Sequence, residues 1–235
     1  MTPGETRILD TWVASERELL AWADRHPVLD VVERRRAESS GARGAHATAS
    51  AVLLRLLAGA RVGVPPAEVE VRRTCASCGG ADHGRPVAAG LAASLSHSGD
   101  VVVAAIGDVS WLGIDVERVR PIDVRRLAGV ALHPREREVV ADDVEAFIDT
   151  WSIKEAVLKA SGTGIVGGGL RRQVVDSLRP LRVVDLSDLG CASGVVHRLP
   201  VPEGYTGFVA VEGSVTWRHV SGLADAAQSS ASRIV

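Results

Sequence analysis

The apolar and polar positions of this chain fall into two successive stretches, and both contain helical patterns with strand patterns after them. In the first stretch, residues 1–40 place apolar side chains at rough helical spacing and predict helix and loop, and residues 45–60 predict a long helix with one apolar face. The alternation over 69–72 predicts a short strand, and the apolar run over 101–106 predicts a buried one. Residues 75–86 are rich in Gly, Ser, Asp and Pro and predict a loop.

The second stretch begins with alternating residues over 112–117, which predict a strand. The later helical patterns cover 125–132, 134–140 and 144–160, and the later strand patterns cover 174–175, 181–186, 195–199 and 205–211. The shared order of helix and strands permits two similar subdomains with a cleft between them. We expect a first domain over 1–108, a second over 109–225 and a frayed tail over 226–235.

The composition is that of a globular protein rather than a disordered, secreted or membrane-spanning one. Apolar residues make up 46% of the 235 residues and charged residues 24%. The net charge of −2 provides no basic excess for nucleic acid, and three cysteines argue against a disulfide scaffold. The longest apolar runs fall far short of the roughly 20 residues that span a bilayer. Because the N-terminus lacks a signal-peptide pattern, we expect a cytoplasmic protein that binds neither nucleic acid nor membranes.

Lysine is used far less often than arginine. Of the 27 basic residues, only Lys154 and Lys159 are lysines. A lysine is a compact, mobile point charge, whereas a guanidinium group is a planar fork. Two lysines so close together indicate positions where arginine would not serve, with chance as the alternative.

Two carboxylates alternate in the strand pattern over 112–117. Asp115 and Glu117 are two positions apart, so they share one face of a strand, and Ile114 and Val116 share the other. Carboxylates side by side repel each other unless a cation or solvent separates them, and oxygen ligands of this kind suit Mg²⁺. For an arbitrary pair with this spacing, a solvated strand face is the commoner explanation.

A third carboxylate lies on the longest predicted helix. Glu155 and Lys159 are four positions apart and project together along the edge of an apolar stripe that includes Trp151. Lys154 falls within the stripe itself. Glu155 either adds a ligand to a metal site beside a phosphate-neutralising Lys159, or forms an ordinary surface ion pair with it.

Two loop segments carry further polar or reactive side chains. Ser96 and His97 precede a glycine, in a segment that can donate hydrogen bonds to a phosphate or simply end a strand. Cys75 and Cys78, followed by His83, resemble half a zinc site. Closed zinc sites take four ligands, so we favour a tightly turned loop with thiols over a zinc site or a redox pair.

These motifs occur in the order and spacing of 4′-phosphopantetheinyl transferases. The sequence resembles the Sfp type, the broad-specificity class that activates polyketide and nonribosomal peptide synthetases. The resemblance covers about residues 34–164. It is carried by Gly84-Arg-Pro86, Ser94-Leu-Ser-His-Ser-Gly99, Gly113-Ile-Asp-Val-Glu117 and Trp151-Ser-Ile-Lys-Glu155 with Lys159.

The resemblance implies an α+β fold with a pseudo-twofold duplication. Two similar subdomains would each pack a small sheet against a long helix, with coenzyme A in the cleft between them. The implied reaction transfers the 4′-phosphopantetheine arm of coenzyme A to a serine hydroxyl of an apo acyl or peptidyl carrier protein and releases 3′,5′-ADP. It also implies Mg²⁺ as the cofactor, with Mn²⁺ as the alternative, and a monomer.

The resemblance also implies a role for each motif residue. Asp115, Glu117 and Glu155 would be the metal ligands. Glu155 would take the serine proton, directly or through a water, with Lys159 and His97 as the other catalytic residues. The implied coenzyme A contacts are Arg35, Arg36, Arg85, Pro86, Ser96, His97, Lys154 and Lys159.

The departures from the family pattern concern the 3′-phosphate contacts. Ala47 follows His46 where family members have arginine, and the segment after the basic run over 34–36 lacks an aromatic residue found in many members. Arg85 stands where some relatives carry lysine. The metal centre does not depart from the pattern.

Two alternative functions remain open at this point. A Mg²⁺-dependent phosphohydrolase would use the same three carboxylates, and a non-enzymatic binding module would be built around Cys75, Cys78 and His83. For the transferase, we expect an acidic helix of the carrier protein to dock on Arg120, Arg125, Arg126 and the apolar residues 130–132.

Overall fold

The computed structural model describes residues 7–75, 78–81, 83–164 and 169–220, which divide into two compact units. Unit 1 comprises residues up to Val109 together with those from Ser214 onward, and unit 2 comprises Ser110–Gly213. The expected frayed tail over 226–235 lies outside the described residues.

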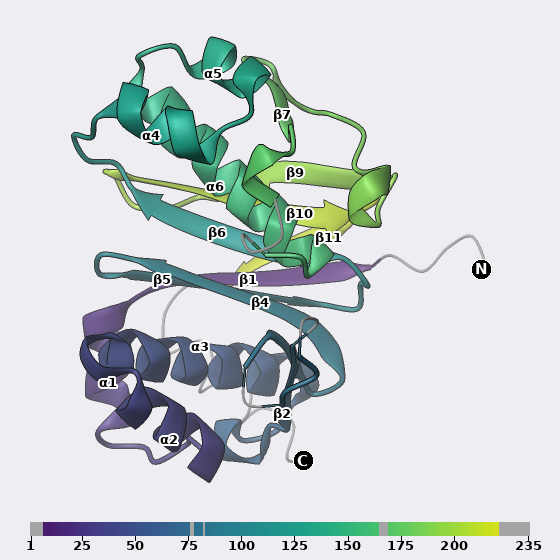
Figure 1. Ribbon diagram of the computed structural model, residues 1–235. Coiled ribbons are helices and arrows are strands. Elements are labelled where there is room, and N and C mark those ends of the chain that lie inside the picture. The colour runs from purple at the N-terminus through teal and green to yellow at the C-terminus, as the bar shows by residue number, and fades with distance from the viewer. Residues whose placement is uncertain (1–6, 76–77, 82, 165–168, 221–235) are drawn as a thin grey trace. The chain divides into compact units, whose positions relative to one another are not determined.

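Unit 1 is a six-stranded sheet packed by helices (Figure 1). The strand order is β11-β1-β5-β4-β3-β2, and the pair β1–β11 is parallel while the other pairs are antiparallel. Its elements are β1 (Ile8–Ser15), α1 (Glu16–Ala23), α2 (Val31–Ser39), α3 (Gly44–Val62), β2 (Val71–Thr74), β3 (Arg85–Ala88), β4 (Leu91–Ser98), β5 (Val101–Gly107) and β11 (Thr216–Val220).

The long helix α3 supplies more buried residues to the core of unit 1 than any other described element. Its Leu53 and Leu57 pack with Trp12 of β1 and Ile106 of β5, all at most 1% exposed. The same helix buries Arg55, which is 2% exposed and pairs with Glu33 and Asp30 at the start of α2. Apolar burial therefore fixes α3 against the sheet, and the satisfied buried cation fixes the start of α2 against α3.

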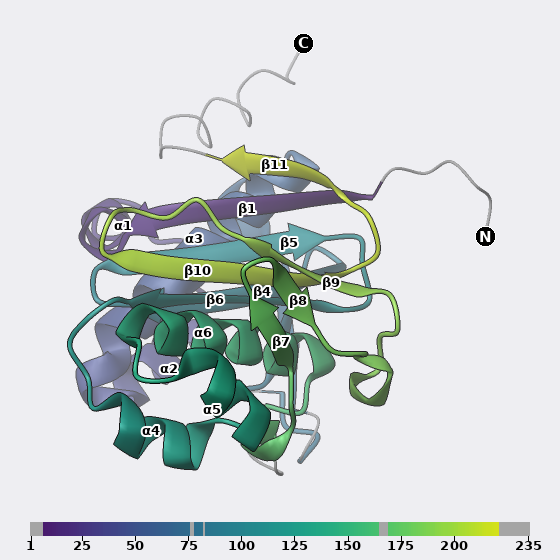
Figure 2. The ribbon, with the colours of Figure 1, turned by 90° about the horizontal axis from the view of Figure 1, so that it is seen from above.

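Unit 2 combines a three-stranded antiparallel sheet, in the order β6-β10-β9, with the separate hairpin β7–β8 (Figure 2). The long helix α6 packs on β6 and β10. The elements are β6 (Leu112–Arg118), α4 (Val124–Ala131), α5 (Pro134–Val140), α6 (Val144–Ser161), β7 (Val175–Leu178), β8 (Leu181–Val183), β9 (Gly194–Arg198) and β10 (Tyr205–Glu212).

The mixed α+β class is confirmed, as are the predicted helices over 45–60, 134–140 and 144–160 and the strands over 101–106 and 112–117. No described helix has both the length and the apolar character needed to cross a membrane.

Four strands correct the expectations. Residues 8–15 form β1 rather than helix, because β5 and β11 pair with both of its edges. Arg85 and Pro86 begin β3 rather than ending a loop, and Ser94–Ser98 belong to β4 rather than to a loop. The second expected domain boundary, at 225, also differs, because the parallel pairing of β11 with β1 returns this strand to unit 1.

The tightest contact between β6 and α6 lies at Gly113. A Cβ atom on Gly113 would sit 1.9 Å from the carbonyl oxygen of Ala156 and 2.6 Å from the backbone nitrogen of Ala160. Both atoms belong to the backbone of α6, so a side chain here would push the helix away from the sheet. Because alternate residues of a strand share a face, Asp115 and Glu117 lie on this same helix-covered face.

We predict that Gly113→Ala lowers the free energy of unfolding by at least about 3 kcal/mol, the upper end of overpacking costs. Urea denaturation at neutral pH measures this change. The matched control is Gly129→Ala in α4, where an added Cβ meets nothing within 4 Å. The control should gain about 0.5–1 kcal/mol from higher helix propensity. A loss below about 1 kcal/mol at Gly113 would contradict the close approach.

Candidate functional site

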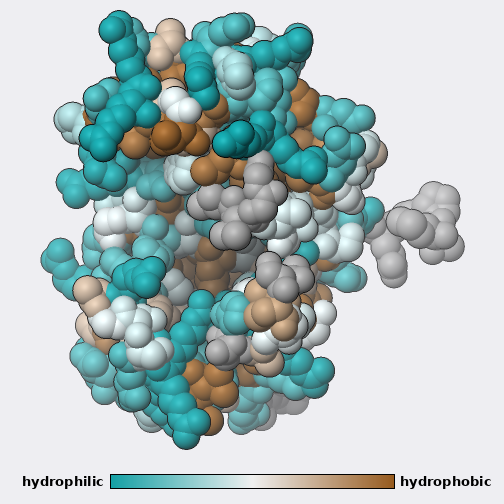
Figure 3. Space-filling view, viewed as in Figure 1, coloured by the Kyte–Doolittle hydropathy of each residue, from teal (hydrophilic) through white to brown (hydrophobic). Residues whose placement is uncertain are grey.

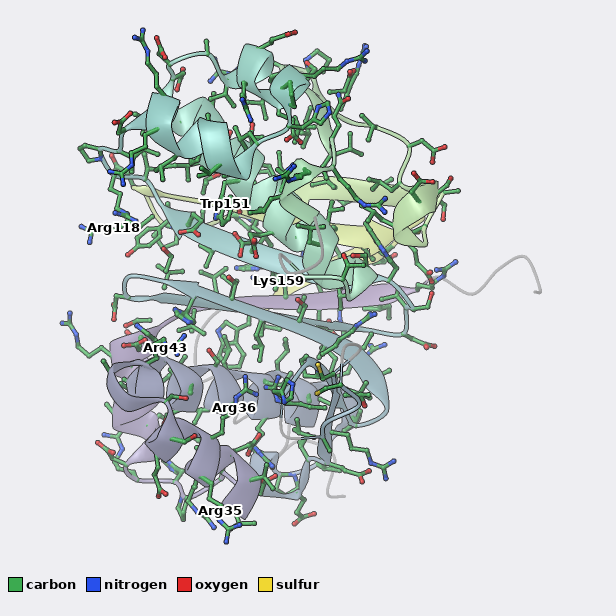
Figure 4. All side chains as sticks on the ribbon, in the orientation of Figure 1. Arg35, Arg36, Arg43, Arg118, Trp151 and Lys159 are labelled. Atoms are coloured by element: carbon green, nitrogen blue, oxygen red, sulfur yellow. The ribbon has the colours of Figure 1, made fainter. Side chains whose placement is uncertain are left out.

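The carboxylates of β6 meet the polar edge of α6. Asp115 is 3% exposed, and its Oδ1 accepts a hydrogen bond from Lys159 Nζ at 2.6 Å. Lys159 Nζ also donates to the carbonyl oxygen of Ile114 at 3.1 Å. About two helical turns earlier on α6, Trp151 Nε1 donates to Glu117 Oε1 at 3.1 Å. Figure 4 shows Trp151 and Lys159 on α6. The shared face predicted for Asp115 and Glu117 is therefore present.

The carboxyl of Glu155 is affected by the charges of Lys159, Asp115 and Glu117. Burial raises the pKa of its carboxyl to about 7; Lys159 lowers it, and the carboxylates of Asp115 and Glu117 raise it further. Its Oε1 is buried and accepts no hydrogen bond within the part of the chain that the structure describes. Three carboxylates and one ammonium group thus share one desolvated region with an excess of negative charge.

This set of donors fits a hard divalent cation. Mg²⁺ binds oxygen ligands, and carboxylates from one or two segments commonly hold it. Glu155 has a partly buried carboxyl whose pKa is raised first by burial and further by the two neighbouring carboxylates, and its Oε1 has no hydrogen-bond partner among the described residues. Asp115, Glu117 and Glu155 would supply the ligand oxygens, and a bound cation would favour the ionised form of Glu155.

Lys154 does not belong to this cluster. It is 0% exposed, and its Nζ donates to Glu136 Oε2 and to the carbonyl oxygen of Arg172, both at 2.6 Å. This enclosure of the ammonium group argues against the expected coenzyme A contact at Lys154. Its place within the apolar stripe, noted in the sequence, reflects a buried ion pair.

In unit 1, His97 lies on β4 with an exposed side chain. Its ring stacks on that of His46 from α3, with ring centroids 4.2 Å apart. His46 Nδ1 in turn contacts Glu16 Oε2 of α1. Ser96 is half-buried on the same strand. The structure thus brings His97 to His46, a neighbour that the sequence motif did not identify as its partner.

The basic residues of unit 1 differ in exposure. Arg35 is exposed and projects outward from α2, whereas Arg36 is half-buried (Figure 4). Arg36 Nη1 is buried and makes no hydrogen bond within the described residues. Nearby, burial and the charge of Arg36 lower the pKa of Arg73 to about 10. Arg36 and Arg73 therefore form a positive region near the base of the β2–β3 hairpin.

Arg85 and Pro86 open β3 at this same place. Arg85 is half-buried and Pro86 is buried, opposite Thr74 and Arg73 of β2. Arg73 Nη1 donates to the carbonyl oxygen of Gly84 at 3.1 Å. Sequence reasoning missed Arg73, Trp151 and Glu136 as polar partners, because each acts through a contact with a distant part of the chain.

Residues 112–189, which contain the carboxylate cluster, match the model of the 4′-phosphopantetheinyl transferase superfamily. The 4′-phosphopantetheinyl transferase HetI of Nostoc sp. is 32% identical over 130 residues, covering 50% of this chain and 52% of HetI. The 4′-phosphopantetheinyl transferase psf-1 of Bacillus pumilus is 37% identical over 79 residues, covering 32% and 34%. A phosphopantetheinyl transferase of Thraustochytrium sp. is 27% identical over 205 residues, covering 75% and 70%.

The chain thus spans about half of HetI and about a third of psf-1. The segment that builds the cluster is the one that is similar to this enzyme superfamily.

We predict that the metal-free protein loses stability as the pH rises from about 5 to 7. The pKa of Glu155 is about 7 in the folded protein, against an ordinary value of 4.5, so the folded state binds the proton more tightly over this interval. Since the folded state holds more protons, the free energy of unfolding falls with rising pH. Urea denaturation in EDTA across this range measures the slope.

Glu155→Gln should flatten this slope, because the amide does not titrate. The control Glu145→Gln, an exposed residue in the first turn of the same helix, should keep it. A Glu155→Gln protein with the wild-type pH slope would contradict the assigned pKa.

Proposed function

We propose that this chain transfers the 4′-phosphopantetheine arm of coenzyme A to a serine hydroxyl of an apo carrier protein. The observation that carries the proposal is the cluster of Asp115, Glu117, Glu155 and Lys159, built from β6 and α6 within the segment that is similar to the transferase superfamily. That similarity favours the transferase over a phosphohydrolase with the same carboxylates.

The chemistry of the cluster suits cleavage of a pyrophosphate. A Mg²⁺ ion, when bound, would polarise the pyrophosphate and offset the charge that builds on the leaving phosphate. Lys159 adds a fixed positive charge in the same place. The serine Oγ forms a bond to the phosphorus that carries the pantetheine arm, the bond from that phosphorus to the bridging oxygen breaks, and 3′,5′-ADP leaves.

In this proposal, Glu155 accepts the serine proton. A general base must be ionised before it takes a proton. Burial raises the pKa of Glu155 to about 7 in the ion-free protein, and a bound cation would favour the ionised form that accepts the proton. Asp115 is held by Lys159 and Glu117 by Trp151, so these two carboxylates are oriented before substrate binds. We therefore assign Glu155 both a ligand oxygen and the proton transfer, and we assign Asp115 and Glu117 the holding of the ion.

The proposal extends to the coenzyme A contacts of unit 1. Arg35 and Arg36 would contact the 3′-phosphate, Arg85 and Pro86 the adenine end, and Ser96 and His97 the phosphates. The partly buried guanidinium of Arg36, with Arg73 beside it, is the observation in this unit that suits an anion. Arg35, which is exposed, is the weaker candidate of the basic pair.

We also propose the Sfp type of specificity, a monomeric state and a cytoplasmic location. The two units support a duplicated architecture, since each packs one long helix on an antiparallel arrangement of strands: α3 on β5 in unit 1 and α6 on β6 in unit 2. Size-exclusion chromatography with light scattering tests the monomer.

We predict that Asp115→Asn and Glu155→Gln each lower the transfer rate by at least about 100-fold while the chain still folds, since each removes a charged ligand oxygen. The assay incubates protein, Mg²⁺, coenzyme A and apo carrier protein, and follows the gain of the phosphopantetheine arm on the carrier by mass spectrometry. Excess EDTA should abolish the wild-type reaction.

Glu145→Gln is the matched control and should keep wild-type activity, because this exposed side chain begins the same helix away from the cluster. Cleavage of coenzyme A without any mass gain on the carrier would assign the phosphohydrolase instead. Full activity in EDTA would refute the metal role.

Carrier docking is the next part of the proposal. Val130 of α4 is 75% exposed and Leu127 is 37% exposed, and apolar side chains gather on the surface over α4 (Figure 3). Ala131 and Leu132 are buried, so the expected apolar surface over 130–132 is reduced to Val130. Arg125 is already paired with Asp142 at 2.6 Å. Arg120, Arg126 and Val130, all exposed, therefore form the proposed docking surface.

We predict that Arg126→Glu raises the KM for the carrier protein about fivefold, corresponding to about 1 kcal/mol for one surface charge. The KM for coenzyme A should stay at the wild-type value. The control Arg182→Glu, an exposed residue of β8, should change neither constant. Equal carrier KM values for both variants would remove α4 from the docking surface.

A further inference from the structure

The connection between β2 and β3 brings three metal-binding side chains together. Cys75, Cys78 and His83 each offer one ligand atom, and these three atoms lie within 4.8 Å of one another. Cys78 Sγ is 3.3 Å from His83 Nε2. Cys75 is half-buried, while Cys78 and His83 are exposed. The sulfur atoms are thiols rather than a disulfide.

The distances suit a small tetrahedral ion. Zinc binds sulfur at about 2.3 Å and imidazole nitrogen at about 2.0–2.1 Å. Tetrahedral geometry then places the ligand atoms roughly 3.6–3.8 Å apart. The observed cluster needs only small side-chain adjustments to reach these separations. Thiolate and imidazole ligands suit zinc, whereas carboxylate oxygens suit Mg²⁺. The cluster therefore differs in chemistry from the carboxylates of unit 2.

The backbone turn after Cys78 brings an N–H group close to the sulfur atom of this residue. Gly79 follows Cys78 with a left-handed φ of +71°, which glycine adopts without strain. The turn directs the backbone N–H of Gly80 to Cys78 Sγ at 3.4 Å, and Cys75 N donates to Gly80 O at 2.9 Å. The backbone of the turn therefore holds the sulfur atom of Cys78 in position beside His83.

The hairpin fixes both ends of this segment. Cys75 directly follows Thr74, which pairs with Arg85 at the open end of the β2–β3 ladder. At Gly84, a Cβ atom would lie 2.3 Å from the carbonyl oxygen of Thr74 and 2.6 Å from Cys75 Cα. The backbone at His83–Gly84 therefore lies directly against the backbone at Thr74–Cys75, so the histidine and the first cysteine are held together by the strand pairing.

We propose that Cys75, Cys78 and His83 bind one Zn²⁺ ion, with the fourth ligand position taken by water. The ion closes the β2–β3 connection and thereby fixes the start of β3. This site is independent of the proposed transferase function, because none of its ligands belongs to the carboxylate cluster.

The test measures metal binding directly. The full chain, purified under reducing conditions, should contain about one zinc per molecule by mass-spectrometric metal analysis. Replacing the zinc by Co²⁺ should produce the near-ultraviolet absorption of a thiolate–cobalt bond. The carboxylate cluster cannot produce this band because it contains no sulfur, so the test stands whether or not the protein transfers phosphopantetheine.

Cys75→Ser and His83→Ala should weaken Zn²⁺ binding at least about 100-fold in a chelator competition. The control Cys191→Ala removes the buried thiol of unit 2 and should keep the stoichiometry and the cobalt band. A wild-type protein that holds no zinc and shows no cobalt–thiolate band would overturn the proposal, as would a Cys75–Cys78 disulfide that forms in the presence of zinc. These wild-type measurements do not depend on the folding of any variant.

Discussion

The buried ion pair between Lys154 and Glu136 fixes the helix on which the candidate site depends. Both side chains are 0% exposed. The carboxylate of Glu136 also accepts hydrogen bonds from the backbone of His133, Val174 and Val175, so one group joins α5, α6 and the start of β7. Burial lowers the pKa of Lys154, and Glu136 opposes that effect. Removing one partner of such a pair leaves an uncompensated buried charge and costs roughly 3–5 kcal/mol. Because consecutive helical residues point about 100° apart, holding Lys154 inward sets the direction of Glu155.

A second constraint is the close contact of Gly113 in β6 with the backbone of α6, which brings the helix near the strand that carries the carboxylates. Gly113 lets the helix backbone approach the strand, and Asp115 and Glu117 follow on the same strand face. The nearest polar groups of α6 then fall opposite them: Lys159 beside Asp115 and Trp151 beside Glu117. A strand shifted by one residue would turn both carboxylates to the other face. The arrangement therefore depends on backbone packing as much as on the charged residues themselves.

The sequence predicted those features that depend only on residues close together in the chain. The face shared by Asp115 and Glu117 follows from strand periodicity, and the edge shared by Glu155 and Lys159 follows from helical periodicity. Strand β1 was missed because its partners, β5 and β11, lie about 90 and 200 residues away in the chain. Lys154 was placed among the ligand contacts by its motif, and the distant Glu136 that encloses it gave no sequence signal. Likewise, a pair of cysteines and one histidine are common in loops, and only the pairing of β2 with β3 shows that their ligand atoms meet.

Because the chain contains only two lysines, one lysine side chain can be labelled selectively. Of its two lysines, Lys154 is wholly enclosed, whereas 29% of the Lys159 side chain is accessible. An amine-directed reagent applied to the folded protein thus has one lysine to modify, and that lysine touches the carboxylate cluster. The labelling rate of this side-chain amine would then rise or fall with whatever occupies the space around Asp115, so a simple modification experiment can monitor occupancy without an engineered probe.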